Sequence, residues 1–303
     1  MPQAYFALGL VGYPLGHSLS PLLHTAALKA CGLQGEYRLY PVTPSGGELE
    51  TLRSLLDEVR RGGLQGLNVT IPHKQAVLPF LDHLSPTAQG VGAVNTIFYR
   101  DGRLVGENTD VAGFWADLAK KSPPPSPTGR GVSGEGPAGG GDQLHPEALV
   151  LGAGGSARAV VYSLSQAGWS VVVAARRLEQ VRELVKTFSV LKYPVSEREL
   201  SQASLADLIS GHEIRLIVNT TPLGMRTYLD ASPWPAGLAF PERAFVYDLV
   251  YNPPQTVFMH QARLAGLGAT NGLGMLLEQA VLSFELWTGV RPSIDILRKA
   301  LNG

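Results

Sequence analysis

The stretch Leu149-Val150-Leu151-Gly152-Ala153-Gly154-Gly155-Ser156-Ala157-Arg158 decides how this chain folds. An apolar run typical of a buried strand passes into a glycine-rich turn, and a helical pattern follows the turn. Gly152 permits a tight turn, Gly154 lets the backbone approach a pyrophosphate, and a helix start offers N–H groups to the anion. The stretch predicts a dinucleotide site in a Rossmann-type parallel sheet. A glycine turn without a ligand is the alternative.

The residues that flank this turn continue the same pattern. Glu147–Leu151 is predicted to form the first strand of the domain, 156–167 its crossover helix and Ser170–Ala175 its second strand. Arg176 and Arg177 follow the second strand, where an Asp or Glu would select the non-phosphorylated cofactor. A guanidinium instead binds a 2′-phosphate through paired, charge-assisted hydrogen bonds. NADP is therefore the predicted cofactor.

The chain before residue 110 alternates predicted strands and helices, which indicates the α/β class. The predicted strands cover 5–11, 36–42 and 66–70, and the predicted helices open at Ser20-Pro21 and cover 48–61. Asp101-Gly102 is flanked by the segments 94–99 and 103–107 and predicts a β-hairpin that puts an antiparallel pair at one edge of the sheet.

Composition excludes several classes of protein. The 25 basic and 25 acidic residues cancel, so no basic footprint for nucleic acid is present. The first ten residues carry no basic signal-peptide region, and no apolar run approaches the roughly 18 residues of a membrane span. Cys31 is the only cysteine and lies in an apolar stretch, so we expect a buried structural thiol. A cytoplasmic protein without a membrane partner is expected.

Further motifs lie in order on both sides of the glycine turn. Those before it are Gly12-Tyr13-Pro14-Leu15-Gly16-His17-Ser18-Leu19-Ser20-Pro21, Asn68-Val69-Thr70-Ile71-Pro72-His73-Lys74, Gly92-Ala93-Val94-Asn95-Thr96 and Asn108-Thr109-Asp110. Those after it are Asn219-Thr220-Thr221-Pro222-Leu223-Gly224-Met225, Asp248-Leu249-Val250-Tyr251-Asn252-Pro253 and Gly272-Leu273-Gly274-Met275, followed by Gln279. In this colinear order the chain resembles the shikimate dehydrogenase family over nearly its whole length.

The resemblance implies two α/β domains. Residues 1–110 with 272–303 would form the substrate-binding catalytic domain, because the predicted helix 275–287 returns to pack on it in the family. Residues 111–271 would form the Rossmann-like NADP-binding domain. The Pro-, Gly- and Ser-rich segment 122–144 is longer than the family's connection, and its composition predicts a flexible insertion.

The resemblance also implies a set of site residues. The catalytic pair would be Lys74 and Asp110. The protein would be a monomer or a homodimer. Substrate would bind to Ser18, Ser20, Asn68, Thr70, Asn95, Tyr251 and Gln279. Cofactor would bind to Gly152, Ala153, Gly154, Gly155, Ser156, Ala157, Arg176, Arg177, Thr221, Gly272 and Met275. The family has Asn-Arg-Thr where this chain has Ala175-Arg176-Arg177, so Arg177 either replaces the threonine contact or lies in solvent.

The sequence positions of these residues support some of the roles and indicate alternatives to others. Asn68 and Thr70 lie two apart on a predicted strand, so their side chains project from one face. Pro72 is predicted to start a short helix that presents Lys74. Ser20 before Pro21 is also typical of a helix N-cap, and Asp110 would serve as an N-cap for a helix near Val111.

The implied reaction is the reversible, NADP-dependent reduction of 3-dehydroshikimate to shikimate, a step of aromatic amino acid biosynthesis. A lysine ammonium carries a proton at neutral pH, so Lys74 would act as general acid with Asp110 holding it in place. No metal is required. The alternatives are a quinate or dual quinate/shikimate dehydrogenase and, from another class, a non-catalytic dinucleotide-binding regulator.

Overall fold

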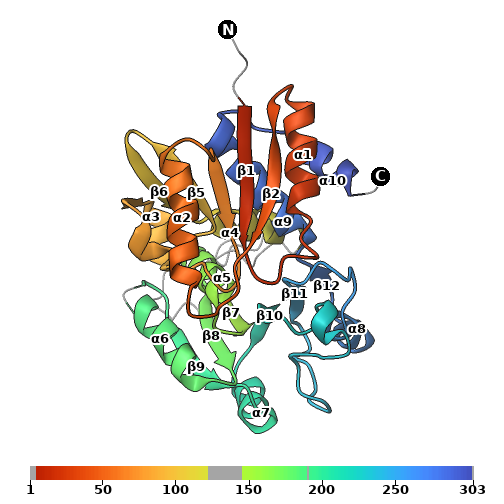
Figure 1. The fold of residues 1–303 in the computed structure, drawn as a ribbon. Helices are drawn as coiled ribbons and strands as arrows, with labels where there is room; N and C mark the ends of the chain where they lie inside the picture. The colour runs from red at the N-terminus through yellow and green to blue at the C-terminus, as the bar shows by residue number, and fades with distance from the viewer. Residues whose placement is uncertain (1–4, 122–144, 190, 302–303) are drawn as a thin grey trace, which may run out of the picture. The chain divides into compact units, whose positions relative to one another are not determined.

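The computed structural model describes residues 5–121, 145–189 and 191–301, so the predicted insertion at 122–144 lies outside the described residues. The chain divides into two compact units. Unit 1 comprises Met1–Phe114 and Gly274–Gly303, and unit 2 comprises Trp115–Leu273. Each unit is built around one six-stranded sheet with helices packed against it (Figure 1). The predicted α/β fold class is confirmed.

Unit 1 contains the first strands and helices of the chain and its C-terminal helices. In chain order these are β1 (Tyr5–Gly12), α1 (Ser20–Ala30), β2 (Gln34–Pro41), α2 (Glu48–Arg60), β3 (Gly66–Val69), the 3₁₀ helix η1 (Leu78–Phe80), β4 (His83–Leu84), α3 (Pro86–Val91), β5 (Thr96–Arg100), β6 (Arg103–Glu107), the start of α4 (Thr109–Lys121), nearly all of α9 (Leu273–Thr288) and α10 (Ile294–Ala300).

The sheet of unit 1 is mixed, in the order β2-β1-β3-β5-β6-β4. Strands β2, β1 and β3 are parallel, β5 is antiparallel to both β3 and β6, and β4 is parallel to β6. The predicted hairpin at Asp101-Gly102 is confirmed, but its predicted place at the edge is wrong. The two-residue strand β4 pairs with β6 on the side away from β5 and so forms the edge of the sheet. This pairing satisfies backbone groups that β6 would otherwise leave without a hydrogen bond.

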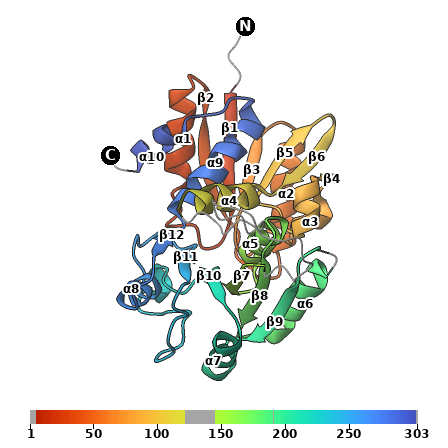
Figure 2. The ribbon, with the colours of Figure 1, turned by 180° about the vertical axis from the view of Figure 1, so that it is seen from behind.

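Both faces of this sheet are covered by helices. Leu52, Leu56 and Val59 of α2 pack with the buried residues of β3 and β5 on one face. On the other face α1, α9 and α10 pack on β1 and β2, and Figure 2 shows α9 in front of the sheet. Cys31 ends α1 and is only partly buried, so the predicted buried thiol is wrong; the α1 C-terminus leaves it at the rim of this cluster.

Helix α9 packs directly on the backbone of the sheet. A Cβ at Gly66 would lie 2.1 Å from the Trp287 indole, so only glycine lets this ring reach β3. The Trp287 indole N–H donates to the Ile97 carbonyl at 3.0 Å. The buried residues of α9 are not all apolar: Gln279 and Ser283 are buried, whereas Leu276 is only partly buried. Polar side chains of α9 therefore point into unit 1.

Unit 2 holds the second sheet and its helices. In chain order these are β7 (Glu147–Leu151), α5 (Gly155–Gln166), β8 (Ser170–Ala175), α6 (Leu178–Phe188), β9 (Val195–Glu199), α7 (Gln202–Gly211), β10 (Ile214–Asn219), the 3₁₀ helix η2 (Arg226–Tyr228), β11 (Phe245–Asp248), α8 (Val257–Leu264) and β12 (Ala269–Asn271).

The sheet of unit 2 is parallel throughout, in the order β12-β11-β10-β7-β8-β9. The chain runs outward from β7 to β9, then returns to β10 and runs outward on the other side. This is the doubly wound Rossmann order, and ligands bind at the carboxyl ends of the strands where the order reverses. That point lies between β7 and β10. The predicted strands Glu147–Leu151 and Ser170–Ala175 are confirmed at these bounds.

Candidate active site

Lys74 and Asp110 form an ion pair in unit 1. Their Nζ and Oδ2 atoms lie 2.5 Å apart, and the side chains are 12% and 7% exposed. The predicted helix after Pro72 is wrong, because residues 71–77 form turns instead. The Lys74 carbonyl accepts from the Val94 N–H at 2.8 Å, so it bonds to the segment before β5 rather than to a helical turn of its own. This bond fixes the base of the Lys74 side chain.

The carboxylate of Asp110 is also held by Asn95. The Asn95 side-chain amide donates to Asp110 Oδ1 at 2.9 Å, and the Thr109 backbone N–H donates to Asn95 Oδ1 at 2.8 Å. A backbone N–H can only donate, so this second bond sets which end of the amide faces Asp110. The predicted N-cap role of Asp110 is wrong, because α4 begins at Thr109 and the Asp110 side chain reaches across to Lys74 and Asn95.

Two other predicted substrate residues lie near this pair with their side chains turned inward. The Asn95 amide lies 3.5 Å from Gln279 Oε1, at the limit of a hydrogen bond. Asn68 is 5% exposed, and its side-chain nitrogen donates to the Asn95 carbonyl at 3.1 Å. Its Oδ1 accepts from the Tyr37 hydroxyl at 2.8 Å. Asn68 is therefore joined to the interior of unit 1 through both ends of its amide.

The remaining predicted substrate residues of unit 1 lie at strand and helix ends. Thr70 follows β3, and its methyl group occupies the space that a Cβ at Gly12 would need, 2.3 Å away. The helix start at Ser20 is confirmed, but its predicted capping role is wrong: the N-cap position is Leu19, without a side-chain cap. Ser18 Oγ accepts from the Ser20 N–H at 3.2 Å, so Ser18 satisfies that end of α1 instead.

Sequence reasoning missed four buried polar residues around this site: His24, Tyr37, Thr96 and Ser283. Ser283 could have been found, because it lies one helical turn after Gln279 and so on the same face. Tyr37 lies on β2, far from the motifs, and nothing in its surroundings indicates its bond to Asn68. His24 stacks on Tyr37 with ring centroids 4.5 Å apart.

The environment of His24 keeps it uncharged. Its ring is completely buried, and burial lowers its pKa from 6.5 to about 3, with Asn68 counteracting this only in part. Neither ring nitrogen has a partner in hydrogen-bonding geometry within the part of the chain that the structure describes. Protonating His24 in the folded state therefore requires a charge in a dry, aromatic pocket.

The glycine turn of unit 2 lies at the point where the strand order reverses. Gly152 has φ 110°, a conformation that favours glycine, and a Cβ there would lie 2.5 Å from Thr220 Oγ1 at the end of β10. Gly154 is exposed, a Cβ on it would meet nothing within 4 Å, and α5 begins at the next residue without a side-chain cap. This backbone cradle fits a pyrophosphate at the helix N-terminus.

The two arginines of the predicted phosphate site are both exposed. Arg176 and Arg177 follow β8, and Arg177 takes the N-cap position of α6.

Two other predicted cofactor residues of unit 2 are held by their neighbours. The Thr221 hydroxyl donates to Asn219 Oδ1, two residues away in the chain, at 2.7 Å. Gly272 is buried against the backbone of Leu249, where a Cβ would lie 2.3 Å from the Leu249 carbonyl oxygen.

Three further residues, Met275, Tyr251 and Asp248, differ in how deeply they are buried. Met275 is buried in unit 1 on α9. Tyr251 is partly exposed in unit 2, and burial of its phenol raises its pKa. Asp248 is fully buried at the end of β11, and burial raises its pKa to about 6 although Thr256, Val250 and Asn219 donate to it.

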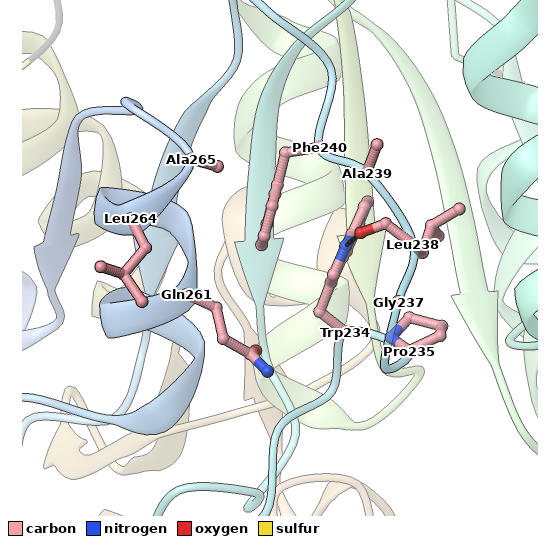
Figure 3. A pocket seen from close by; sticks show the side chains of 9 residues that line it. All are labelled: Trp234, Pro235, Gly237, Leu238, Ala239, Phe240, Gln261, Leu264 and Ala265. Carbon is pink, nitrogen blue, oxygen red and sulfur yellow. Dashed lines mark hydrogen bonds between the residues drawn. The ribbon is translucent and has the colours of Figure 1, made fainter.

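A hollow of about 470 Å³ lies elsewhere on unit 2, away from the glycine turn. Figure 3 shows the Trp234 and Phe240 rings side by side, with Gln261 and Leu264 of α8 facing them. The rings stack at 4.5 Å, and the Trp234 indole donates to the Leu238 carbonyl. The lining is mostly apolar and, unlike the Lys74–Asp110 pair, brings together no groups suited to proton transfer.

In residues 5–121, 145–189 and 191–301, no helix has an apolar stretch of membrane-spanning length. The same residues hold no group of three or more His, Cys, Asp or Glu side chains placed to bind a metal ion.

Known proteins match this chain at both ends and along its length. A family model described as the shikimate dehydrogenase substrate binding domain matches residues 10–97, and one described as the shikimate 5′-dehydrogenase C-terminal domain matches residues 272–301. The shikimate dehydrogenase (NADP(+)) of Oleidesulfovibrio alaskensis is 41% identical over 291 residues, which cover 93% of this chain and 89% of the relative. The chain belongs to the shikimate dehydrogenase family.

A second shikimate dehydrogenase (NADP(+)), from Thermus thermophilus, is 40% identical over 96% of this chain and 95% of its own. A crystal structure of a Thermus thermophilus shikimate 5-dehydrogenase in complex with NADP(H) and shikimate superposes with a TM-score of 0.78, at 38% identity and 98% coverage of both chains. The predicted family is confirmed. The similarity extends over both units, because the matched regions cover 93–98% of this chain.

Proposed function

We propose that this protein catalyses the reversible NADP-dependent reduction of 3-dehydroshikimate to shikimate, in the biosynthesis of aromatic amino acids. The observation that carries the proposal is the Lys74–Asp110 ion pair, held at 2.5 Å in a member of the shikimate dehydrogenase family. A proton donor with an oriented, largely buried partner is what the reduction of a ketone requires.

Lys74 is the general acid of the reduction. NADPH, when bound, supplies the hydride. The Lys74 ammonium donates a proton to the carbonyl oxygen as negative charge develops there, and its charge stabilises that oxygen before the proton moves. In the reverse direction the Lys74 amine accepts the proton of the substrate hydroxyl. Asp110 holds the ammonium in place, and Asn95 holds Asp110.

The substrate residues fit a polar ring that carries a carboxylate. Ser18 and Ser20 at the start of α1 would bind the carboxylate, where the N–H groups of the helix favour an anion. Asn68, Thr70, Asn95, Tyr251 and Gln279 would bind the ring hydroxyls through their amides and hydroxyls. The inward hydrogen bonds of Asn68 support a role in holding its neighbours as well as a direct contact.

The cofactor residues of unit 2 fit NADP. The backbone of Gly152, Ala153, Gly154, Gly155, Ser156 and Ala157 would hold the pyrophosphate, and Arg176, with Arg177 beside it, would hold the 2′-phosphate. Support comes from the exposed position of both guanidinium groups at the end of β8 and from the absence of an acidic residue at the strand end. Thr221, Gly272 and Met275 would complete the cofactor site.

A matrix of activities tests the proposal. The purified full chain is assayed with NADP⁺ or NAD⁺ against shikimate or quinate, following the absorbance of the reduced nicotinamide. We expect the highest kcat/KM for NADP⁺ with shikimate. Quinate with kcat/KM equal to that of shikimate would favour the dual-specificity alternative, and no turnover with any pair would favour a dinucleotide-binding regulator.

The proposal also covers the localisation, the assembly and the partners of the protein. Biosynthetic chemistry on a small soluble substrate and a single cysteine fit a cytoplasmic enzyme that works as a monomer or homodimer. The balanced charge of the chain fits the absence of a nucleic-acid partner. Size-exclusion chromatography with light scattering distinguishes the two assembly states.

A further inference from the structure

Ser283 lies where four elements of unit 1 meet, although no sequence motif includes it. It is completely buried on α9. Its hydroxyl lies 2.8 Å from Thr96 Oγ1 on β5, 3.1 Å from Asn68 Nδ2 on β3 and 3.1 Å from Thr109 Oγ1 on α4. It donates to the Gln279 carbonyl of its own helix at 3.0 Å. Ser283 is therefore the shared neighbour of residues that surround the proposed active site.

The hydroxyl of Ser283 has one proton and two lone pairs, which limits how these contacts are made. The proton goes to the Gln279 carbonyl. The lone pairs then accept from the amide of Asn68, whose orientation is set by its bond to the Asn95 carbonyl, and from the hydroxyl of Thr96, the closest neighbour. Ser283 thus accepts hydrogen bonds from two donors that are buried away from water.

Both donors have a further acceptor on Asn95, which is the backbone carbonyl for Asn68 and the side-chain Oδ1 for Thr96. Thr96 Oγ1 lies 3.1 Å from Asn95 Oδ1, and it is the nearest donor to that atom apart from Thr109. Without the Ser283 hydroxyl, Thr96 keeps two neighbouring oxygens, and Asn95 Oδ1 is nearer than Thr109 Oγ1 at 3.3 Å. Because an unmade hydrogen bond in a dry interior is costly, Thr96 would draw the Asn95 amide toward itself and away from Asp110.

We propose that Ser283 is a positioning residue of the dehydrogenase, which holds the Asn95 amide on Asp110 by accepting the Thr96 and Asn68 donors. It touches neither substrate nor cofactor and acts through Asn95. This inference rests on the proposed function, since it concerns the same site. It assigns part of the catalytic geometry to a hydroxyl on the C-terminal helix of unit 1.

The first test compares two buried serine-to-alanine changes. Ser283→Ala should lower kcat/KM for shikimate about 5- to 20-fold, the scale of one or two lost net hydrogen bonds. The KM for shikimate should rise at least about threefold while the KM for NADP⁺ stays unchanged. Ser165→Ala is the matched control, because Ser165 is equally buried on α5 and its hydroxyl has no partner among the described residues. It should leave all three constants within about twofold.

The kinetic pattern separates positioning from a folding defect. A purely structural role would reduce the amount of active enzyme, so the apparent kcat would fall and both KM values would stay unchanged. That result, or wild-type constants for Ser283→Ala, would overturn the inference. An inactive wild-type protein would instead overturn the proposed function, so the two failures are distinguishable.

A double-mutant cycle tests the route through Asn95. If Ser283 acts through Asn95, Ser283→Ala should change kcat/KM by less than about twofold in the Asn95→Ala background, because the group it positions is already gone. Effects of the two substitutions that multiply would show that Ser283 acts independently of Asn95, which contradicts the proposal. Circular-dichroism melting of each variant confirms that folded protein is compared.

Discussion

The interior of unit 1 holds amide and hydroxyl side chains from several elements bonded to one another, whereas the buried carboxyl of Asp248 in unit 2 accepts from Asn219 at the end of β10 and from Thr256 at the N-cap of α8. The difference follows from what each unit is proposed to bind. A ring with several hydroxyls is recognised by side chains that must be oriented, so their supports are buried with them. A pyrophosphate is recognised by backbone N–H groups, so the strands beneath can be apolar.

The comparison extends to pH. His24 in unit 1 resists gaining a proton, while Asp248 in unit 2 resists losing one. Acid should therefore weaken unit 1 and strengthen unit 2. The comparison would fail if a change at Lys74 altered the cofactor constants or a change at Arg176 altered only the substrate constants.

The largest effect is expected at the ion pair of unit 1. Lys74→Ala should lower kcat about 10²- to 10⁴-fold, because a positioned general acid contributes on that scale, with a smaller change in the KM for shikimate. Steady-state kinetics measures it. Lys29→Ala, which removes an exposed lysine of α1, is the control. A Lys74→Ala enzyme that kept more than about a third of the wild-type kcat would exclude Lys74 as the acid.

The next effect concerns unit 2 and the choice of cofactor. Arg176→Ala should weaken NADP binding roughly 10- to 150-fold, since a hydrogen bond to a charged group contributes about 1.5–3 kcal/mol, and should leave NAD binding nearly unchanged. Titration of both cofactors by intrinsic fluorescence checks this. Arg182→Ala, on the exposed part of α6, should change neither. Equal losses for the two cofactors would show that Arg176 does not read the 2′-phosphate.

Acid should destabilise the protein through His24. Its folded pKa of about 3 lies below the unfolded value of 6.5, so only the unfolded state gains the proton as pH falls between them. The free energy of unfolding should drop by about 2 kcal/mol between about pH 8 and pH 5 from this residue. Urea unfolding at each pH measures it. His24→Phe should remove most of the drop, whereas the same change at exposed His260 should not.

The smallest effect has the opposite sign and comes from Asp248. Its folded pKa of about 6 exceeds the unfolded value of 3.8, so its contribution to stability is full below 3.8 and is lost as pH rises through 6. Acidification from about pH 8 to pH 5 should add about 1 kcal/mol. In Asp248→Asn this gain should vanish, and the exposed control Asp207→Asn should keep it. An unchanged pH dependence in Asp248→Asn would show that the carboxyl is not the source.

The sequence predicted the first elements of unit 2 closely, since β7 and β8 are continuous apolar runs and the turn between β7 and α5 needs glycine. β7 and β8 have the predicted bounds, and Gly152 adopts the positive φ that only glycine takes readily. The predictions around Lys74 and Ser20 were weaker. Pro72 is typical of a helix start, but the Val94 N–H bonds to the Lys74 carbonyl and residues 71–77 form turns. Ser20 is typical of an N-cap, but α1 takes Leu19 as its N-cap and the Ser20 N–H donates to Ser18 Oγ.

By itself the sequence determined the class of fold, the family and the identity of the residues proposed to carry the chemistry, because these depend on short motifs and on the periodicity of apolar residues. Only the tertiary structure decided which atoms those residues present to one another. Tyr37 and Ser283 are far from Asn68 in the chain, yet both form hydrogen bonds with its side-chain amide. Hydrogen bonds between distant residues follow no periodic pattern along the chain, since they exist only once β2, β3, β5, α4 and α9 have packed together.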